Sequence, residues 1–226
     1  MKQNPKDINK FILFVVIGVF VFTQSYLKPL AGNIYLLFIV SYLGSLGFYH
    51  VFVIVLYWLV NNVSFLLKIY YNRTFLKGIW SYKYTLNNKV YFGIWNINQD
   101  LNGILINGYG INIDGKPRSD VRSVSQLIYN KGAFDIVNSR EDLIEPEKEN
   151  FSKTTLHPIA KNSNGLSIPY PTSMRARTYI YGGRLSGTIH VDVLFEKHED
   201  IKSEDDVRIK LIDEIKQNYN PSMYEY

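Results

Sequence analysis

The hydrophobic pattern divides the chain into an apolar N-terminal part and a longer part of alternating polarity. Residues Phe11–Leu27 are mostly Phe, Ile, Val and Leu, and Ile34–Leu59 contains no Lys, Arg, Asp or Glu. Between them, Lys28–Asn33 contains the Pro, Gly and Asn of a turn. Each run is close to the about 20 helical residues that cross a bilayer core. We therefore predict a hairpin of two transmembrane helices, with residues 60–71 as an interfacial segment and residues 1–71 as the membrane anchor.

From Gly78 onward the hydrophobic period changes to two, which is typical of half-buried strands. The predicted strands begin at Trp80 and continue with Val90–Asn98, Ile104–Ile113, Val121–Asn130, Ala133–Asn138, Phe151–Ile159, Arg175–Tyr181 and Thr188–Lys197. Turn residues separate most of them, and we predict a surface loop or short helix for Arg140–Asn150. About eight short strands favour an up-and-down antiparallel barrel over residues 72–226. A sandwich is the alternative fold.

The pattern returns to a helical period at the C-terminal end of this domain. Ser203 with Asp206 three residues later is a capping pair, and Val207, Leu211 and Ile215 recur every four residues. We predict a helix over 203–219.

The positive charge of the chain lies mainly beside the apolar runs. The formal net charge is +5, and residues 1–71 contain five lysines against one aspartate. The domain after them is nearly neutral, so a DNA- or RNA-binding face is not expected. Lysines precede the first helix and basic residues follow the second, whereas the turn has only Lys28. The positive-inside rule therefore predicts a multi-pass membrane protein with the N-terminus and the barrel in the cytoplasm.

A cleaved signal peptide is the alternative interpretation of the N-terminus. The apolar run is longer than a usual signal core, and no A-x-A site follows it. Leu30-Ala31-Gly32 is similar to the start of a lipobox, but Asn33 stands where the lipidated cysteine would be. Uncleaved helices are therefore expected.

The second apolar run contains a group of small residues at helical spacing: Ser41, Gly44, Ser45 and Gly47. Small residues let helices approach closely in lipid. They serve either packing within the hairpin or membrane assembly between copies of the chain. His50, in the same run, is either a functional group or a neutral, hydrogen-bonded one.

Catalytic and metal-binding motifs are missing from the sequence. The chain has no cysteine, and its four histidines lack the spacing of metal ligands. His190 and Asp192 share one strand face, but Ile189, Val191 and Val193 claim the buried face, which favours an exposed polar pair. No Walker or dinucleotide-binding fingerprint is present. We predict a protein that is not an enzyme and needs no cofactor.

A ligand-binding role is predicted from one strand. By the period of two, Arg175, Arg177, Tyr179 and Tyr181 lie on one strand face. Arginine binds phosphate with a rigid fork, and aromatic rings stack on bases. This face, together with Tyr109, is the predicted ligand site. The alternative is an outer face on which arginine lies over tyrosine. Trp80 and Trp95 are expected to fill the barrel floor.

The order of these parts resembles a known family. The segments that carry the resemblance are Gly78-Ile79-Trp80-Ser81-Tyr82, Gly93-Ile94-Trp95-Asn96-Ile97-Asn98-Gln99 and Gly103-Ile104-Leu105-Ile106-Asn107-Gly108. With two membrane helices before them, they are similar to the two-transmembrane, β-strand-rich effectors of bacterial cyclic-oligonucleotide antiphage systems (CBASS), whose barrels are lipocalin-like. The resemblance implies a cytoplasmic barrel that binds a cyclic dinucleotide made by a partner nucleotidyltransferase. Self-association in the inner membrane, disruption of that membrane and abortive infection would follow.

Two other functions stay open at this stage. One is a membrane-tethered, lipocalin-like carrier or sensor of an apolar ligand, which predicts an apolar pocket without arginine. The other is a structural membrane protein whose barrel binds a protein partner.

Overall fold

The computed structural model describes residues 5–27, 33–112, 114–125, 127–143, 149–160, 170–181, 189–201 and 203–218. The chain forms two compact units, residues 1–67 and residues 68–226. Each has its own fold, and the two are described separately.

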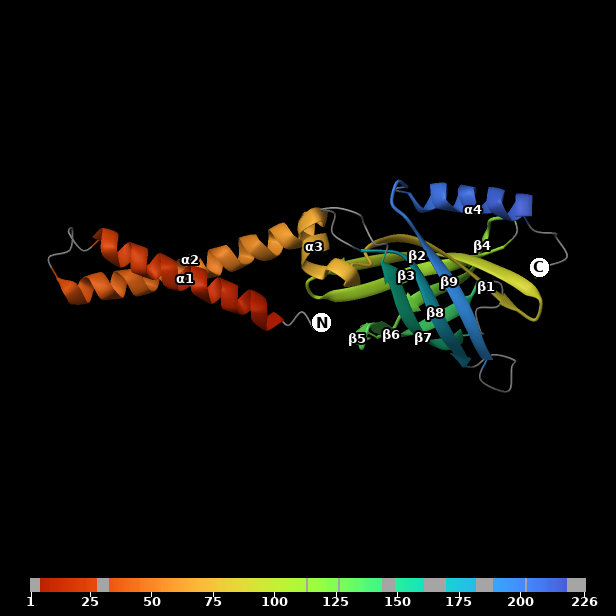
Figure 1. Cartoon of the computed structure of the whole chain (residues 1–226), viewed down its shortest axis with the longest axis horizontal. Coiled ribbons are helices and arrows are strands. Elements are labelled where there is room, and N and C mark those ends of the chain that lie inside the picture. The colour runs from red at the N-terminus through yellow and green to blue at the C-terminus, as the bar shows by residue number, and fades with distance from the viewer. Residues whose placement is uncertain are drawn as a thin grey trace. The chain divides into compact units, whose positions relative to one another are not determined.

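The first unit is a helical hairpin. Helices α1 (Pro5–Leu27) and α2 (Ile34–Asn62) pack against each other and run in opposite directions (Figure 1). The stretch Phe38–Asn62 of α2 is long and apolar enough to span a membrane. The described apolar part of α1, Ile12–Tyr26, is about 22 Å long and falls short of a bilayer core. Among the described residues, α2 is therefore the one helix that meets the length and polarity of a span.

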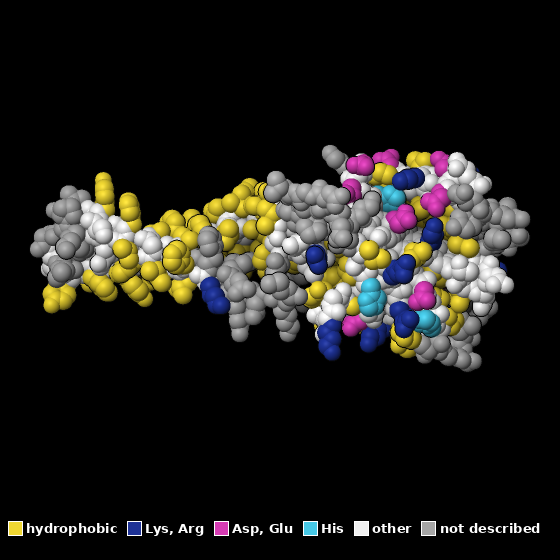
Figure 2. Space-filling model, in the orientation of Figure 1, with side chains coloured by type: hydrophobic (Ala, Val, Ile, Leu, Met, Phe, Trp, Pro, Cys, Tyr) yellow, Lys and Arg dark blue, Asp and Glu magenta, His cyan; other side chains and the backbone are white. Residues whose placement is uncertain are grey.

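Apolar side chains cover the outside of this hairpin (Figure 2). Large exposed examples are Phe14, Phe22, Tyr35, Leu43 and Val51. A continuous apolar surface of this kind is typical of contact with lipid or with another protein.

A short helical segment connects the hairpin to the barrel. Helix α3 (Ser64–Tyr71) is followed by the single turn η1 (Asn72–Thr74). The carbonyl of Thr74 accepts a bond from the Gln99 side chain, whose Oε1 accepts bonds from the backbone of Leu76 and Lys77. These bonds fix the entry of the chain into the barrel.

The second unit contains an eight-stranded antiparallel barrel, as predicted. Its strands are β1 (Gly78–Leu86), β2 (Lys89–Asp100), β3 (Gly103–Ile111), β4 (Pro117–Ser123), β6 (Ala133–Asp142), β7 (Glu149–Ala160), β8 (Pro171–Tyr181) and β9 (Ile189–His198). Each pairs with its neighbours in the sheet, and β1 pairs with both β2 and β9. Pairing of β4 with β6 closes the sheet, which rules out the sandwich.

The single strand predicted for Val121–Asn130 is two strands. β4 ends at Ser123, and the three-residue strand β5 (Ile128–Asn130) pairs with β6 and with no other strand that the structure describes. Across the interruption, the Val124 N–H donates to the Val137 carbonyl, and the Ser125 hydroxyl accepts from the Val137 N–H. The left-handed backbone of Lys131 and Gly132 then makes the β5–β6 hairpin.

The prediction of a loop or short helix for Arg140–Asn150 is wrong at both ends. β6 continues to Asp142, four residues beyond its expected end, and β7 begins at Glu149. The inward positions of β6 change from apolar Phe134 and Ile136 to polar Asn138 and Arg140. A strand with polar residues on its inner face lacks the hydrophobic alternation on which the prediction depends.

Helix α4 (Glu204–Asn218) lies along the outside of the barrel (Figure 1). The Ser203 hydroxyl accepts from the Asp205 N–H, which confirms the predicted start of the helix. The apolar face of α4 packs on outward residues of β1, β2 and β3; together they form the cluster Ile79, Phe92, Ile94, Ile111, Val207, Leu211 and Ile215. These strands are therefore buried on both faces where α4 covers them, whereas Leu105 and Asn107 on the outer face of β3 are exposed.

Inward side chains of all eight strands fill most of the barrel. At the end where β1 begins, Leu76 and Trp80 are fully buried, and the Trp80 indole donates to the Leu76 carbonyl at 2.7 Å. We call this the closed end, and it confirms Trp80 as part of the floor. Trp95 is the cross-strand partner of Trp80 and is buried in the same core cluster.

Candidate ligand-binding site

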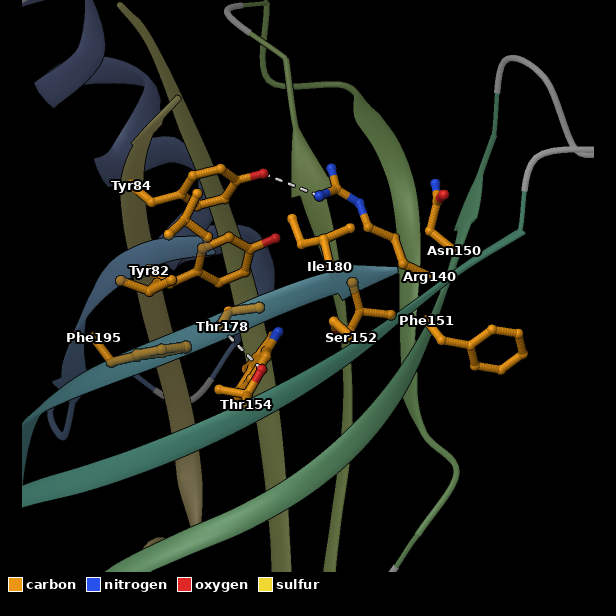
Figure 3. Close-up of a pocket in the computed structure, with 14 residues that line it drawn as sticks. Tyr82, Tyr84, Arg140, Asn150, Phe151, Ser152, Thr154, Thr178, Ile180 and Phe195 are labelled. Carbon is orange, nitrogen blue, oxygen red and sulfur yellow. Dashed lines mark hydrogen bonds between the residues drawn. The ribbon is translucent and has the colours of Figure 1, made fainter. Parts of the chain in front are cut away.

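A cavity of about 50 Å³ lies inside the barrel toward the end opposite the closed end. Seven of the eight barrel strands line it, and Figure 3 shows its labelled side chains. The lining residues are Tyr82, Tyr84, Trp95, Val121, Arg140, Asn150, Phe151, Ser152, Thr154, Thr178, Ile180, Val191, Val193 and Phe195. The wall is thus mainly aromatic and aliphatic, with one cation and a few hydroxyl groups.

Arg140 supplies the charge of this cavity. Its Nη1 donates to the Tyr84 hydroxyl and its Nε to the Ser119 hydroxyl, both at 3.0 Å. No ion pair found among the described residues includes Arg140. The adjacent Tyr84 hydroxyl, with Tyr82 and Asp142, raises the pKa of Arg140 against the opposing effect of burial. A permanently charged guanidinium is therefore held inside the barrel by neutral hydroxyl groups, an arrangement that suits an anion.

Three inward glycines make the space that this arrangement needs. Tyr82 stands opposite Gly93 in the β1–β2 register, and a side chain at Gly93 would overlap the Tyr82 ring. At Gly110 an added Cβ would lie 2.7 Å from the hydroxyl oxygen of Ser119, which holds Arg140, and 3.4 Å from Arg140 Nη2. At Gly108 it would meet Trp95. β2 and β3 therefore form a thin wall against which the large side chains lie.

Aromatic rings surround the guanidinium. Tyr82 and Tyr84 are nearly parallel, with centroids 6.3 Å apart, and Tyr84 stacks on Tyr91 at 4.9 Å. Burial raises the pKa of Tyr82 well above its usual value. Its phenol therefore stays protonated at neutral pH and can donate a hydrogen bond. In Figure 3 the hydroxyls of both Tyr82 and Tyr84 point toward Arg140.

The hydroxyls deeper in the cavity come from β7 and β8. Thr154 and Thr178 are paired across the ladder, and their hydroxyl oxygens are 3.0 Å apart. Ser152, two residues from Thr154, also lines the cavity. Phe151 points away from it, and 46% of its surface is exposed.

The strand face on which the sequence placed the ligand site lies on the outer wall of the barrel. Arg175 and Arg177 are exposed, whereas Met174 and Ala176 point inward and are buried. Arg175, Arg177 and Tyr179 line an outer groove with His157, Asp192 and Leu194. None of the predicted ligand residues is among those that line the interior cavity. The placement is that of the outer-face alternative, and their contact with a ligand stays a prediction.

The surroundings of these outer residues are those of a solvated surface. Arg177 Nε lies 3.7 Å from the Asp192 carboxylate, and the Tyr179 ring is 5.3 Å from the His190 ring. Tyr181 is exposed. Figure 2 shows basic, acidic and histidine side chains intermixed on the barrel. The Tyr109 side chain is also outside, where burial beside α4 raises its pKa.

The histidine and metal predictions concern the same surface. His190 and Asp192 are both exposed, with 3.7 Å between His190 Nε2 and the carboxylate. This is the expected polar pair. Over the residues that the structure describes, no group of three or more His, Asp or Glu is arranged to hold a metal.

Sequence reasoning missed the residues that carry the chemistry of the interior: Arg140, Tyr82 and Tyr84. The available signal was the alternation Phe134, Ile136, Asn138, Arg140, in which the last two share the face of two apolar residues. Following that alternation past Asn138 would have placed Arg140 inside the barrel.

The small residues of α2 divide into two pairs. Ser41 and Ser45 are buried in the hairpin, and the Ser45 hydroxyl donates to the Tyr42 carbonyl. Gly44 and Gly47 are exposed, and an added Cβ at either would meet no atom within 4 Å. The serines therefore serve packing within the hairpin, and the glycines leave an open surface.

Comparison of the chain with models of known protein families, with curated proteins and with solved structures returned no significant match. We therefore infer function from the geometry of the site and from the resemblance of the sequence.

Proposed function

We propose that the barrel is a sensor for a small anionic ligand that also carries an aromatic or apolar group. The observation that carries this proposal is Arg140, a guanidinium inside the barrel whose direct partners are the Tyr84 and Ser119 hydroxyls. An anion bound there would gain charge-assisted hydrogen bonds from a preorganised donor. Tyr82 and Tyr84 offer flat surfaces for stacking beside it.

The ligand class that we propose is a cyclic dinucleotide. The cavity of about 50 Å³ is much smaller than the 300–1,000 Å³ typical of sites for drug-sized ligands. We therefore propose that one phosphate and its neighbouring group enter the barrel at Arg140. The rest of the ligand would lie at the open end, beside the last residues of β6 and β8 and the first residues of β7.

The wider role that we propose is that of a CBASS effector. The barrel would lie in the cytoplasm and α1 and α2 would both cross the inner membrane, with Lys residues at their cytoplasmic ends. Ligand made by a partner nucleotidyltransferase would favour association of several copies through the open Gly44 and Gly47 surface. Membrane disruption and abortive infection would follow. A ligand can drive this association only by binding the assembled state more tightly.

An anionic lipid-like ligand is the second candidate. The aliphatic wall residues Val121, Ile180, Val191 and Val193 suit an acyl chain, and Arg140 with Tyr84 suits its carboxylate. This candidate keeps the carrier or sensor function but replaces the purely apolar ligand with an amphipathic one.

Calorimetry on the full-length protein in detergent micelles tests both candidates. The probes are a panel of cyclic dinucleotides and a panel of fatty acids. Arg140→Met should weaken binding of the true ligand more than tenfold, since a hydrogen bond to a charged group contributes about 1.5–3 kcal/mol. Arg175→Met removes the same charge from the outer wall and should leave affinity unchanged.

Each result separates the hypotheses. Binding of a cyclic dinucleotide, recovered intact, supports the nucleotide sensor without catalysis. Fatty-acid binding with the same dependence on Arg140 supports the second candidate. If Arg175→Met, and not Arg140→Met, abolishes binding, the ligand site is the outer groove and the interior proposal is wrong.

A further inference from the structure

Besides Arg140, the barrel interior contains a second buried polar side chain, Asn138, for which no hydrogen bond is found in the described part of the chain. Asn138 has no exposed surface, and neither its Oδ1 nor its Nδ2 has a hydrogen-bond partner in the described part of the chain. Buried polar groups in native proteins are nearly always hydrogen-bonded, so an amide with both atoms unpaired is unusual. Such a group is either bonded to water or kept for a ligand.

Asn138 lies next to the cavity and on the same strand face as Arg140. They are two positions apart along β6, which is about 6.7 Å in a strand. Across the ladder Asn138 pairs with Ser152, and Val121 pairs with Arg140. Ser152 and Val121 both line the cavity, which reaches past this level to Thr154, the partner of Ile136. Asn138 is not itself a lining residue, but its ladder partner Ser152 and its same-face neighbour Arg140 both are, so the amide lies beside the cavity, one step deeper than the guanidinium.

The chemistry of an amide limits what it can recognise. Asn presents an acceptor oxygen and an NH₂ donor side by side. The complementary group is a planar edge with an adjacent donor and acceptor, as in the heterocyclic bases of nucleotides; Asn and Gln read adenine in this bidentate way. A fatty acid has no such edge. A phosphate has acceptors only and would be held by Arg140.

We propose that Asn138 is a specificity-determining residue that reads the hydrogen-bonding edge of a nucleobase while Arg140 holds the phosphate attached to that nucleoside. This inference rests on the proposed function of the cavity as an anion site. It adds that the deeper half of the site selects a base, and so it names a nucleotide rather than an anionic lipid as the ligand.

The test measures two probes that differ by the base. Full-length protein in detergent micelles is titrated with a purine nucleoside 5′-monophosphate and with ribose 5-phosphate. Two variants remove the amide. Asn138→Leu replaces it with an apolar side chain, and Asn138→Ser, which has a small polar side chain, is used if Asn138→Leu does not fold. Asn107→Leu, at an exposed outer position of β3, is the matched control.

The expected result is selective. Both Asn138 variants should bind the nucleotide at least tenfold more weakly and ribose 5-phosphate within twofold of the original protein, and Asn107→Leu should change neither. Melting temperature should not fall in Asn138→Leu, because an unpaired amide is removed. If the Asn138 variants keep full affinity for the nucleotide, or lose both probes equally, the inference is wrong and the anion site stands. If neither probe binds the original protein, the proposed function fails with it.

Discussion

Lys197 gives the barrel a pH dependence that can be measured. It lies on β9 near the closed end, and its Nζ is buried without a hydrogen-bond partner among the described residues. The ammonium lies over the rings of Phe75 at 4.5 Å, Tyr170 at 5.4 Å and Trp80 at 5.5 Å. These contacts offset only part of the lost hydration.

Burial lowers the pKa of Lys197 from 10.5 to about 8; the Glu199 carboxylate acts in the opposite direction and the Lys68 charge adds to the lowering. The unfolded chain keeps this proton up to about pH 10.4. Between pH 8 and 10.4 the unfolded state therefore binds more protons, and stability rises with pH. At 1.36 kcal/mol per pKa unit the full gain is about 3 kcal/mol, of which about 2 kcal/mol should be reached by pH 9.5.

Urea unfolding of the full-length protein in micelles, followed by tryptophan fluorescence, measures this gain at pH 7.0 and 9.5. Lys197→Met keeps the apolar stem, and Lys153→Met removes one exposed charge as a control. The free energy of unfolding should rise from pH 7.0 to pH 9.5 in the original protein and in Lys153→Met. In Lys197→Met this rise should be smaller by about 2 kcal/mol. The pKa of Tyr71 is raised to about 12, so that phenol does not titrate in this window. An equal rise in all three proteins would refute the reasoning.

Two further predictions concern glycines. Gly93→Ala should lower stability by about 1–3 kcal/mol and weaken ligand binding, because the new Cβ would overlap both the Tyr82 ring and the Tyr109 carbonyl; an unchanged urea midpoint would contradict the tight wall. Gly44→Leu should leave the hairpin folded and ligand binding intact, since its Cβ meets open space, but reduce crosslinked oligomers in membranes. Ser41→Leu should instead disturb the hairpin, because Ser41 is buried in it. Oligomers that persist in Gly44→Leu would show that copies of the chain do not associate through the Gly44 and Gly47 surface.

The local pattern was enough to predict most of the elements and the class of the fold. Alternation of polar and apolar residues located most strands, because a strand buried on one face must alternate. The capping Ser203 and the spacing of Val207, Leu211 and Ile215 located α4 for the same kind of reason, since helical faces repeat every three to four residues. Such signals act between residues close in sequence, so no tertiary contact is needed to recognise them.

Where each strand face points was decided by the tertiary structure. On β8 both faces have mixed polarity, so alternation separates Arg175 from Ala176 without saying which is inside. The register with β9 decides this, because Ala176 lies beside Val193, whose side chain belongs to the apolar interior. Inward and outward positions exchange if a register shifts by one residue, and registers depend on the whole closed sheet.

The closure of the sheet into a barrel likewise decided which polar side chains lie inside it. Pairing of β4 with β6 brings Val121 beside Arg140 and directs Asn138 and Arg140 into the barrel. Nothing in residues 138–142 alone distinguishes an inward polar face from a surface loop, because both are polar. The contact between α1 and α2 is also a long-range matter. Ser41 and Ser45 of α2 are buried in the hairpin that α2 forms with α1, while Gly44 and Gly47, only a few residues away, are open. The sequence alone therefore determined most of the elements, but neither the break between β4 and β5 nor the polar end of β6. Only the packing of distant segments could decide which of their side chains share a cavity.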